Sequence, residues 1–181
     1  MIPRATRIAR EAPPGWNLVK TGVQIVFFWG FFLWLVPVLV ARVQTAMNWD
    51  GVLGFPSRPW LGAMLFGFAG SIGLWSAVVM AWRGGGTPMP TDAPRKLVIS
   101  GPYRWVRNPM ALAGITQGVA VGLMLGSWSV CAYAICGALM WNAFVRPWEE
   151  ADLAARFGEE FERYRAAVRC WLPRVRPYTA R

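Results

Sequence analysis

Three long stretches without a charged residue constrain the fold of this chain more than any other feature. They comprise 21 residues at 21–41, 24 residues at 59–82 and 38 residues at 108–145. A transmembrane helix needs about 20 predominantly apolar residues, because the hydrocarbon core of a bilayer is about 30 Å thick. The first two stretches therefore predict one membrane span each.

The third stretch is too long for a single crossing, since 38 helical residues would extend about 57 Å. It divides most readily at the segment LGSWS, around Gly126 and Ser127, into a tight hairpin of two spans. The four predicted spans are 21–42, 60–82, 109–126 and 128–145. The predicted fold class is all-α: a polytopic membrane helix bundle, in a single domain over 1–181, with a kink near Pro37 in the first span.

The composition agrees with a membrane protein. Hydrophobic residues make up 55% of the chain and charged residues only 15%, which is too apolar a balance for a soluble domain of this length. The net charge of +10 would suit a nucleic-acid binder, but the basic residues fall between the apolar stretches. We therefore expect them to contact anionic membrane lipids and to orient the protein, and we expect no nucleic-acid partner.

The chain offers few residues of the kinds that usually bind metals. It contains no histidine, which removes the commonest metal ligand and the usual general base. The three cysteines, Cys131, Cys136 and Cys170, are spaced neither as zinc ligands nor as a disulfide framework. We expect no metal site.

The distribution of lysine and arginine predicts the orientation of the chain. With four spans, 17 of the 19 Lys and Arg residues fall on one side, in the N-terminal segment 1–20, the loop 83–108 and the tail 146–181. The positive-inside rule makes that side the cytoplasm. We therefore expect a multi-pass protein of a bacterial inner membrane, with both termini cytoplasmic and the first span retained as an anchor.

The tail 146–181 predicts an amphipathic cytoplasmic helix rather than a fifth span. Its apolar residues recur at helical spacing, at Leu153, Phe157, Phe161, Tyr164 and Val168. Two i,i+4 ion pairs, Asp152–Arg156 and Glu159–Arg163, are expected on the solvated face. Gly158 is expected to weaken this helix by only about 1 kcal/mol relative to alanine. The glycine- and proline-rich part of loop 83–108 is expected to be a flexible connection.

Two polar clusters border the third and fourth spans. Arg104, Arg107 and Asn108 precede the third span, and Arg146 with Glu149 and Glu150 follows the fourth. Because a hairpin brings its two ends together, these clusters are expected to be neighbours. They are either an interfacial Arg–Glu set that closes the hairpin, or a polar pocket that holds a charged cofactor while it receives a lipid-borne substrate.

The segment GGGTPMPTDAPRKLVISGPYRWVRNPM, followed by a hairpin and RPWEEADLAARFGEEFERY, resembles the isoprenylcysteine carboxyl methyltransferase and phospholipid methyltransferase family. The resemblance covers about 60–175. Its members are integral membrane enzymes that use S-adenosylmethionine. The chain departs from the family pattern at Asn108, where histidine is frequent, and at Ala111, where tyrosine is frequent. Loss of that tyrosine would leave a more open pocket.

The resemblance implies a set of site residues. The implied cofactor-binding residues are Gly101, Pro102, Tyr103, Arg104, Arg107, Asn108, Pro109, Glu149 and Glu150. The implied catalytic residues are Arg146, Glu150 and Asn108. Glu149 and Glu150 suit the ribose of the cofactor, because carboxylates bind ribose hydroxyls in nucleotide sites. Arg104 or Arg107 suits its carboxylate, because arginines pair with carboxylates. Pro109 suits the start of the third span, because proline is favoured at the first position of a helix.

The function that the resemblance implies is transfer of the methyl group of S-adenosylmethionine to a lipophilic or lipid-borne acceptor at the cytoplasmic face. A carboxylate of the isoprenylcysteine kind is the favoured acceptor, because its methylation joins opposite charges and needs no general base. A phospholipid amine and a small hydrophobic acid stay open. The alternatives are an NADPH-dependent sterol-type reductase of similar fold and a non-catalytic membrane protein of the same family.

Overall fold

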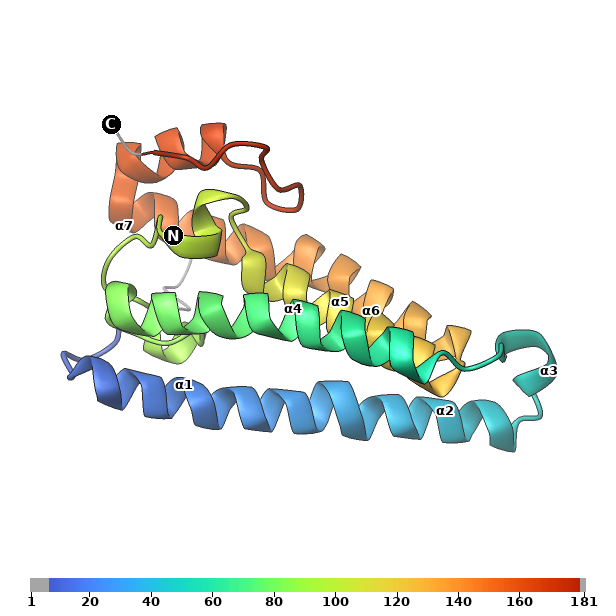
Figure 1. The fold of residues 1–181 in the computed structure, drawn as a ribbon. Helices are drawn as coiled ribbons and strands as arrows, with labels where there is room; N and C mark the ends of the chain where they lie inside the picture. The colour runs from blue at the N-terminus through green and yellow to red at the C-terminus, as the bar shows by residue number, and fades with distance from the viewer. Residues whose placement is uncertain (1–6, 180–181) are drawn as a thin grey trace.

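The computed structural model describes residues 7–179, and helices supply nearly all of their regular structure. Figure 1 shows long helices running side by side, with α7 and the C-terminal segment gathered at one end. Within the described residues there is no β-strand, only two isolated bridges, Ile8–Ala93 and Gly54–Ser127. The predicted all-α helix bundle is confirmed.

Four apolar helices form the body of the molecule. The first runs over Pro14–Ala46 and consists of α1 (Pro14–Phe28), a π-helical segment (Trp29–Leu35) and α2 (Val36–Ala46). The others are α4 (Pro59–Val79), which a π-helical turn extends to Gly84, α5 (Pro109–Leu125) and α6 (Trp128–Met140). A short helix, α3 (Asp50–Leu53), follows α2. We name the end of the bundle near α7 the α7 end, and the end near α3 the hairpin end.

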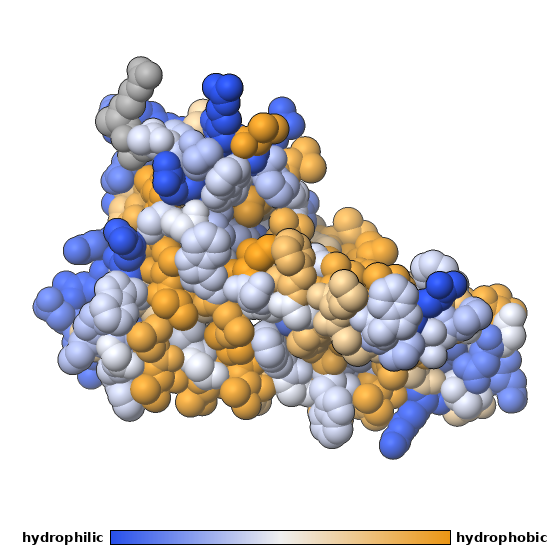
Figure 2. All heavy atoms as spheres, viewed as in Figure 1, coloured by the Kyte–Doolittle hydropathy of each residue, from blue (hydrophilic) through white to orange (hydrophobic). Residues whose placement is uncertain are grey.

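Three of these helices are long and apolar enough to cross a bilayer: Pro14–Ala46, Pro59–Gly84 and Trp128–Ala167. The shorter helix α5 is also apolar. Their outward side chains are apolar and exposed, among them Val26, Trp34 and Phe144, which are 73%, 68% and 68% exposed. Figure 2 shows apolar side chains over the middle of the bundle and hydrophilic ones at its two ends. This is the surface of an integral membrane protein.

The first helix is longer than its uncharged stretch predicts. It begins at Pro14 instead of residue 21, and so it includes Lys20, whose ammonium pairs with the Asp92 carboxylate at 2.5 Å. The helix also continues through Pro37. The preceding turn is π-helical, and the Val36 N–H donates to the Phe31 carbonyl, five residues back. Figure 1 shows α1 and α2 continuing into each other without a sharp bend, so the predicted kink is replaced by a locally widened helix.

The hairpin between α5 and α6 lies where the sequence predicts it. Gly126 ends α5 with a left-handed φ of 65°. A Cβ at this position would lie 2.4 Å from the Phe55 carbonyl oxygen, so only glycine fits here. The Ser127 side chain then accepts from the Val130 N–H at 3.3 Å and caps α6.

Helix α6 continues without interruption, through a π-helical segment (Trp141–Val145), into α7 (Arg146–Ala167). The expectation of one amphipathic helix is wrong at Gly158, whose φ of 50° and ψ of −127° break the helix. Figure 1 shows the chain turning back after the first part of α7. The apolar face is nevertheless recovered, because Phe161, Tyr164 and Val168 are buried together and Leu153 and Phe157 pack against them.

Both predicted ion pairs of α7 form, at 3.0 Å for Asp152–Arg156 and 3.6 Å for Glu159–Arg163. Only the second is solvated as expected. The side chains of Asp152 and Arg156 are 16% and 14% exposed. The first pair therefore belongs to the interior of the α7 end.

Loop 83–108 is a defined structure, contrary to the expectation of a flexible connection. Two short 3₁₀ helices, Pro90–Asp92 and Gly101–Arg104, lie within it. The Ala93 N–H donates to the Arg7 carbonyl and the Ala93 carbonyl accepts from the Ala9 N–H, both at 2.9 Å. Thr87 is fully buried and accepts from the Gln24 amide at 3.1 Å. The loop is thus tied to the N-terminal segment and to α1.

Candidate functional site

A cavity of about 600 Å³ lies at the α7 end. Its walls come from the first helix, α4, α5, loop 83–108 and α7. The polar residues that line it are Gln24, Lys96, Tyr103, Arg107, Asn108, Gln117, Glu149, Asp152, Arg156 and Tyr164. Apolar residues line the rest, among them Phe28, Trp29, Phe32, Leu33, Leu74 and Met80. One space therefore joins two kinds of lining. We call the part lined by Lys96, Arg107, Glu149, Asp152 and Arg156 the charged wall, and the part lined by these apolar residues the apolar wall.

The two predicted polar clusters meet beside this cavity. The Arg107 Nη1 atom donates to Glu150 Oε1 at 2.6 Å, and Arg146 Nε donates to the same oxygen at 2.8 Å. Arg107 is held further by Nε, which donates to the Val168 carbonyl at 2.7 Å. The prediction that the hairpin makes these clusters neighbours is confirmed. The Glu150 side chain is 18% exposed, so this carboxylate bridges two arginines in a partly desolvated place.

The adjacent glutamates have different surroundings, because consecutive helical residues point about 100° apart. Glu150 is held by the two arginines and is absent from the cavity wall. Glu149 lines the cavity. Within residues 7–179 its side chain forms no ion pair or hydrogen bond. Of the two carboxylates, Glu149 is therefore the one available to a ligand.

Asn108 combines a structural position with a place on the cavity wall. Its Oδ1 atom accepts from the Ala111 N–H at 3.0 Å, which makes it the N-cap of α5, and Pro109 occupies the first helical position. Asparagine is among the best N-cap residues, which gives a physical reason for its presence where the family frequently has histidine. Asn108 thus fixes the start of α5 at the edge of the cavity.

The segment GPYR places a neutral phenol in the cavity wall. Gly101 has a φ of 58°, and a Cβ there would lie 2.9 Å from a methyl group of Val79. Tyr103 is buried, and its carbonyl accepts from the Tyr164 hydroxyl at 2.6 Å. Burial raises the pKa of the Tyr103 phenol far above its usual range. The phenol therefore stays protonated and neutral.

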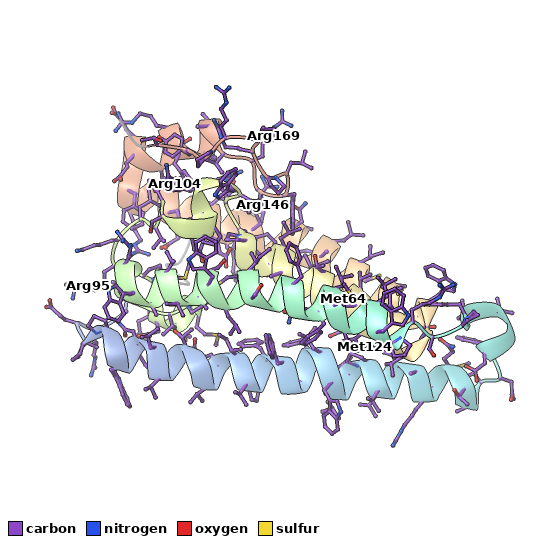
Figure 3. The ribbon with its side chains drawn as sticks, viewed as in Figure 1. Met64, Arg95, Arg104, Met124, Arg146 and Arg169 are labelled. Atoms are coloured by element: carbon purple, nitrogen blue, oxygen red, sulfur yellow. The ribbon has the colours of Figure 1, made fainter. Side chains whose placement is uncertain are left out.

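Several predicted site residues do not reach the cavity. Arg104 Nε donates to the Tyr178 carbonyl at 2.7 Å, so this arginine anchors the C-terminal segment. Figure 3 shows Arg104, Arg146 and Arg169 at the same end of the molecule, near α7. The other predicted residues outside the cavity wall are Gly101, Pro102, Pro109, Arg146 and Glu150. Of the predicted set, Tyr103, Arg107, Asn108 and Glu149 line it.

Some residues of the cavity wall were missed at the sequence level. The sequence pattern placed Lys96 in a flexible connection. It placed the Asp152–Arg156 pair on a solvated helix face. Gln24 and Gln117 lie inside the predicted spans 21–42 and 109–126. An amide within an otherwise apolar span was a usable signal for these two, because polar groups in a membrane usually have a specific role.

Two comparisons with known proteins bear on the family of this chain. Residues 57–160 match the family described as phospholipid methyltransferase, and this match covers more than half of the chain. A curated relative, the cobalt-zinc-cadmium resistance protein CzcN of Cupriavidus metallidurans, is 31% identical over 142 residues. That alignment covers 78% of this chain, but the chain spans only 61% of the length of the relative. The resemblance noted in the sequence is confirmed: the chain belongs to the phospholipid methyltransferase family.

Proposed function

We propose that this protein transfers the methyl group of S-adenosylmethionine to a lipophilic acceptor at the membrane surface. The observation that carries this proposal is the cavity that joins a charged wall to an apolar wall in one space of about 600 Å³. Ligand pockets typically have volumes of about 300–1,000 Å³. A charged cofactor and an apolar acceptor need such a combination, since they must meet although they prefer different solvents.

The charged wall fits S-adenosylmethionine. Glu149 is the carboxylate we assign to the ribose hydroxyls or the cationic end of the cofactor, because it lines the cavity without another partner in the described part of the chain. We assign Arg107 to the carboxylate of the cofactor, because Glu150 and the Val168 carbonyl already fix its guanidinium. When bound, the cofactor supplies an electrophilic methyl group.

The apolar wall fits an acceptor with a hydrocarbon body. Phe28, Phe32 and Leu33 of the first helix face the cavity and can contact an acyl or prenyl chain. A carboxylate is the acceptor group we propose. It is nucleophilic without a base, and exclusion of water by the apolar wall favours a step that joins two opposite charges. We assign Lys96, which also lines the cavity, to holding this carboxylate before transfer.

We propose that the α7 end faces the cytoplasm of a bacterial cell. Apart from Arg42 and Arg58, the Lys and Arg residues that the structure describes belong to segments at this end. Such an excess of positive charge is typical of cytoplasmic connections. The orientation would open the charged wall toward the compartment in which the cofactor is made.

Methyl transfer can be tested directly. Purified protein in lipid nanodiscs would be incubated with a bacterial lipid extract and S-adenosylmethionine labelled with tritium in its methyl group. We expect label in the organic phase and its release as methanol in alkali, which is the behaviour of a methyl ester. Glu149→Gln should lower the rate at least tenfold, whereas Glu159→Gln, on the exposed part of α7, should not. Absence of labelled lipid would contradict the proposal. Label that is stable in alkali would show that the acceptor group is an amine and not a carboxylate.

A further inference from the structure

Gln117 is the central residue of α5 (Pro109–Leu125). A helix of 17 residues is about 26 Å long, so with α5 spanning the bilayer we infer that Gln117 lies close to the middle of the hydrocarbon layer. Its side chain is only 2% exposed, and it belongs to the wall of the cavity. The cavity that begins at the charged α7 end therefore reaches a polar group deep within the membrane.

The amide of Gln117 lacks a hydrogen-bond partner among the described residues, as do the buried side-chain oxygens of Asn17, Thr21 and Gln24. Its Nε2 atom is buried and has no hydrogen-bond acceptor among the described residues. By contrast, the buried Ser127 hydroxyl donates to Gln44 at 2.6 Å, and the neighbouring Thr116 hydroxyl donates to the Leu112 carbonyl at 2.8 Å. At this depth bulk water does not supply the missing acceptor. An unpartnered N–H in such a place points to a ligand.

Space for a ligand lies one turn away on the same helix. Gly114 lines the cavity, and a Cβ at this position would meet no atom within 4 Å. On the other side, a Cβ on Gly70 would lie 3.1 Å from Gln117 Nε2, so the amide rests against the backbone of α4. The last torsion of glutamine is soft. The amide can therefore turn its N–H toward the space beside Gly114.

We propose that the cavity binds the tail of the methyl acceptor along α5, and that the Gln117 amide donates to an oxygen within that tail. This inference rests on the proposed function and narrows its substrate class. Gln117 lies nine residues beyond Asn108, which is about 13 Å along the helix. The acceptor is then an amphiphile with an anionic head and a ketone, ester or ether oxygen near the middle of its tail. A plain hydrocarbon tail would leave the amide unpaired.

A pair of defined acids tests this inference. Tritiated stearic acid and a tritiated stearic acid with a mid-chain ketone would be bound to the full protein in nanodiscs, with a scintillation proximity readout. We expect the wild-type protein to bind the keto acid about tenfold more tightly, as a hydrogen bond to a buried amide implies. Gln117→Leu should remove this preference. Thr116→Val, a matched change outside the cavity wall, should keep it.

Gly114→Leu supplies a second test. A leucine here would fill the open space, so we expect the affinity for both acids to fall at least tenfold while the affinity for S-adenosylmethionine stays unchanged. Equal binding of the two acids by the wild-type protein, a preference that survives Gln117→Leu, or no saturable binding of either acid would overturn the inference. The acid measurements require no cofactor and no turnover. A failure of this inference is therefore distinguishable from a failure of the proposed function, which the cofactor measurement reports.

Discussion

Glu149 and Glu150 are adjacent in the sequence but have different roles in our account. Glu150 bridges Arg107 and Arg146 at 2.6 and 2.8 Å, whereas Glu149 faces the cavity. A carboxylate between two arginines stabilises the junction of α5 and α7, and a carboxylate on a cavity wall is available to a ligand. We therefore expect replacement of Glu150 to lower stability and replacement of Glu149 to weaken ligand binding.

Replacing Glu150 by glutamine should lower stability. The change would leave two partly buried guanidinium groups without their carboxylate, and we expect a loss of about 2 kcal/mol. In a chain of this size, that corresponds to an apparent melting temperature roughly 4–8 °C lower, measured in detergent by tryptophan fluorescence. Glu149→Gln should not lower the melting temperature. Equal effects of the two variants would contradict the separation.

At the scale of elements, the hairpin depends on the backbone conformation of Gly126. Its φ is 65°, and a Cβ would lie 2.4 Å from the Phe55 carbonyl oxygen. Gly126→Ala should therefore destabilise the protein by about 1–3 kcal/mol, since it adds both strain and a clash. Gly137→Ala in α6, where a Cβ would meet no atom within 4 Å, is the matched control and should be neutral or stabilising. Thermal unfolding in detergent compares the two, and a Gly126→Ala variant as stable as wild type would refute this view of the turn.

The break in α7 at Gly158 gives a second prediction. Its φ of 50° and ψ of −127° are accessible to glycine and strained for alanine. Alanine favours a continuous helix, which would carry Phe161 and Tyr164 away from the core they share with Val168. We expect Gly158→Ala to increase hydrogen exchange over 159–168 while exchange in α4 and α5 stays unchanged. Unchanged exchange in both regions would show that the break is not needed for the core.

The elements were largely predictable from the sequence, but their ends and their irregularities were not. Charge-free stretches gave the four helices and the turn at Gly126, because burial in a membrane excludes charge. They did not predict the start of the first helix at Pro14, since a helix can continue past the bilayer when Lys20 forms an ion pair with Asp92. The break at Gly158 was missed because a glycine within a helix usually costs only about 1 kcal/mol.

The candidate site was predictable only where the order of the helices along the chain determines which residues meet. The sequence brought Arg107 and Glu150 together through the hairpin, and the structure confirms this contact. Which of the two glutamates faces the cavity depends on the helical phase carried from α6 into α7 through a π-helical segment, which no residue pattern reveals. Lys96 reaches the cavity only through the folded path of loop 83–108.

At the scale of the whole molecule, the described Lys and Arg residues other than Arg42 and Arg58 belong to segments at the α7 end, and Figure 2 shows hydrophilic side chains at both ends of an apolar body. This asymmetry predicts a single orientation in the membrane. A fluorescent-protein fusion after residue 181 should fluoresce in bacteria. An alkaline phosphatase inserted after Asn48, at the hairpin end, should be active. The reverse pattern would place the cavity on the wrong side for a cytoplasmic cofactor.

The cavity is the feature through which the fold would act as an enzyme. Lys96, Arg107 and Glu149 line it at the α7 end, and Gln117 lines it farther along α5. A water-soluble donor and a membrane-soluble acceptor could thus approach one space from different solvents. The central claim of our account is that the charged wall of this space binds S-adenosylmethionine.

Calorimetric titration of S-adenosylmethionine into the detergent-purified protein tests that claim most directly. We predict saturable micromolar binding to the wild-type protein, affinity at least tenfold weaker for Glu149→Gln, and no heat of binding with NADPH. Glu159→Gln should bind as the wild type does. Absence of saturable binding by wild-type protein with a cooperative melting transition would contradict the account.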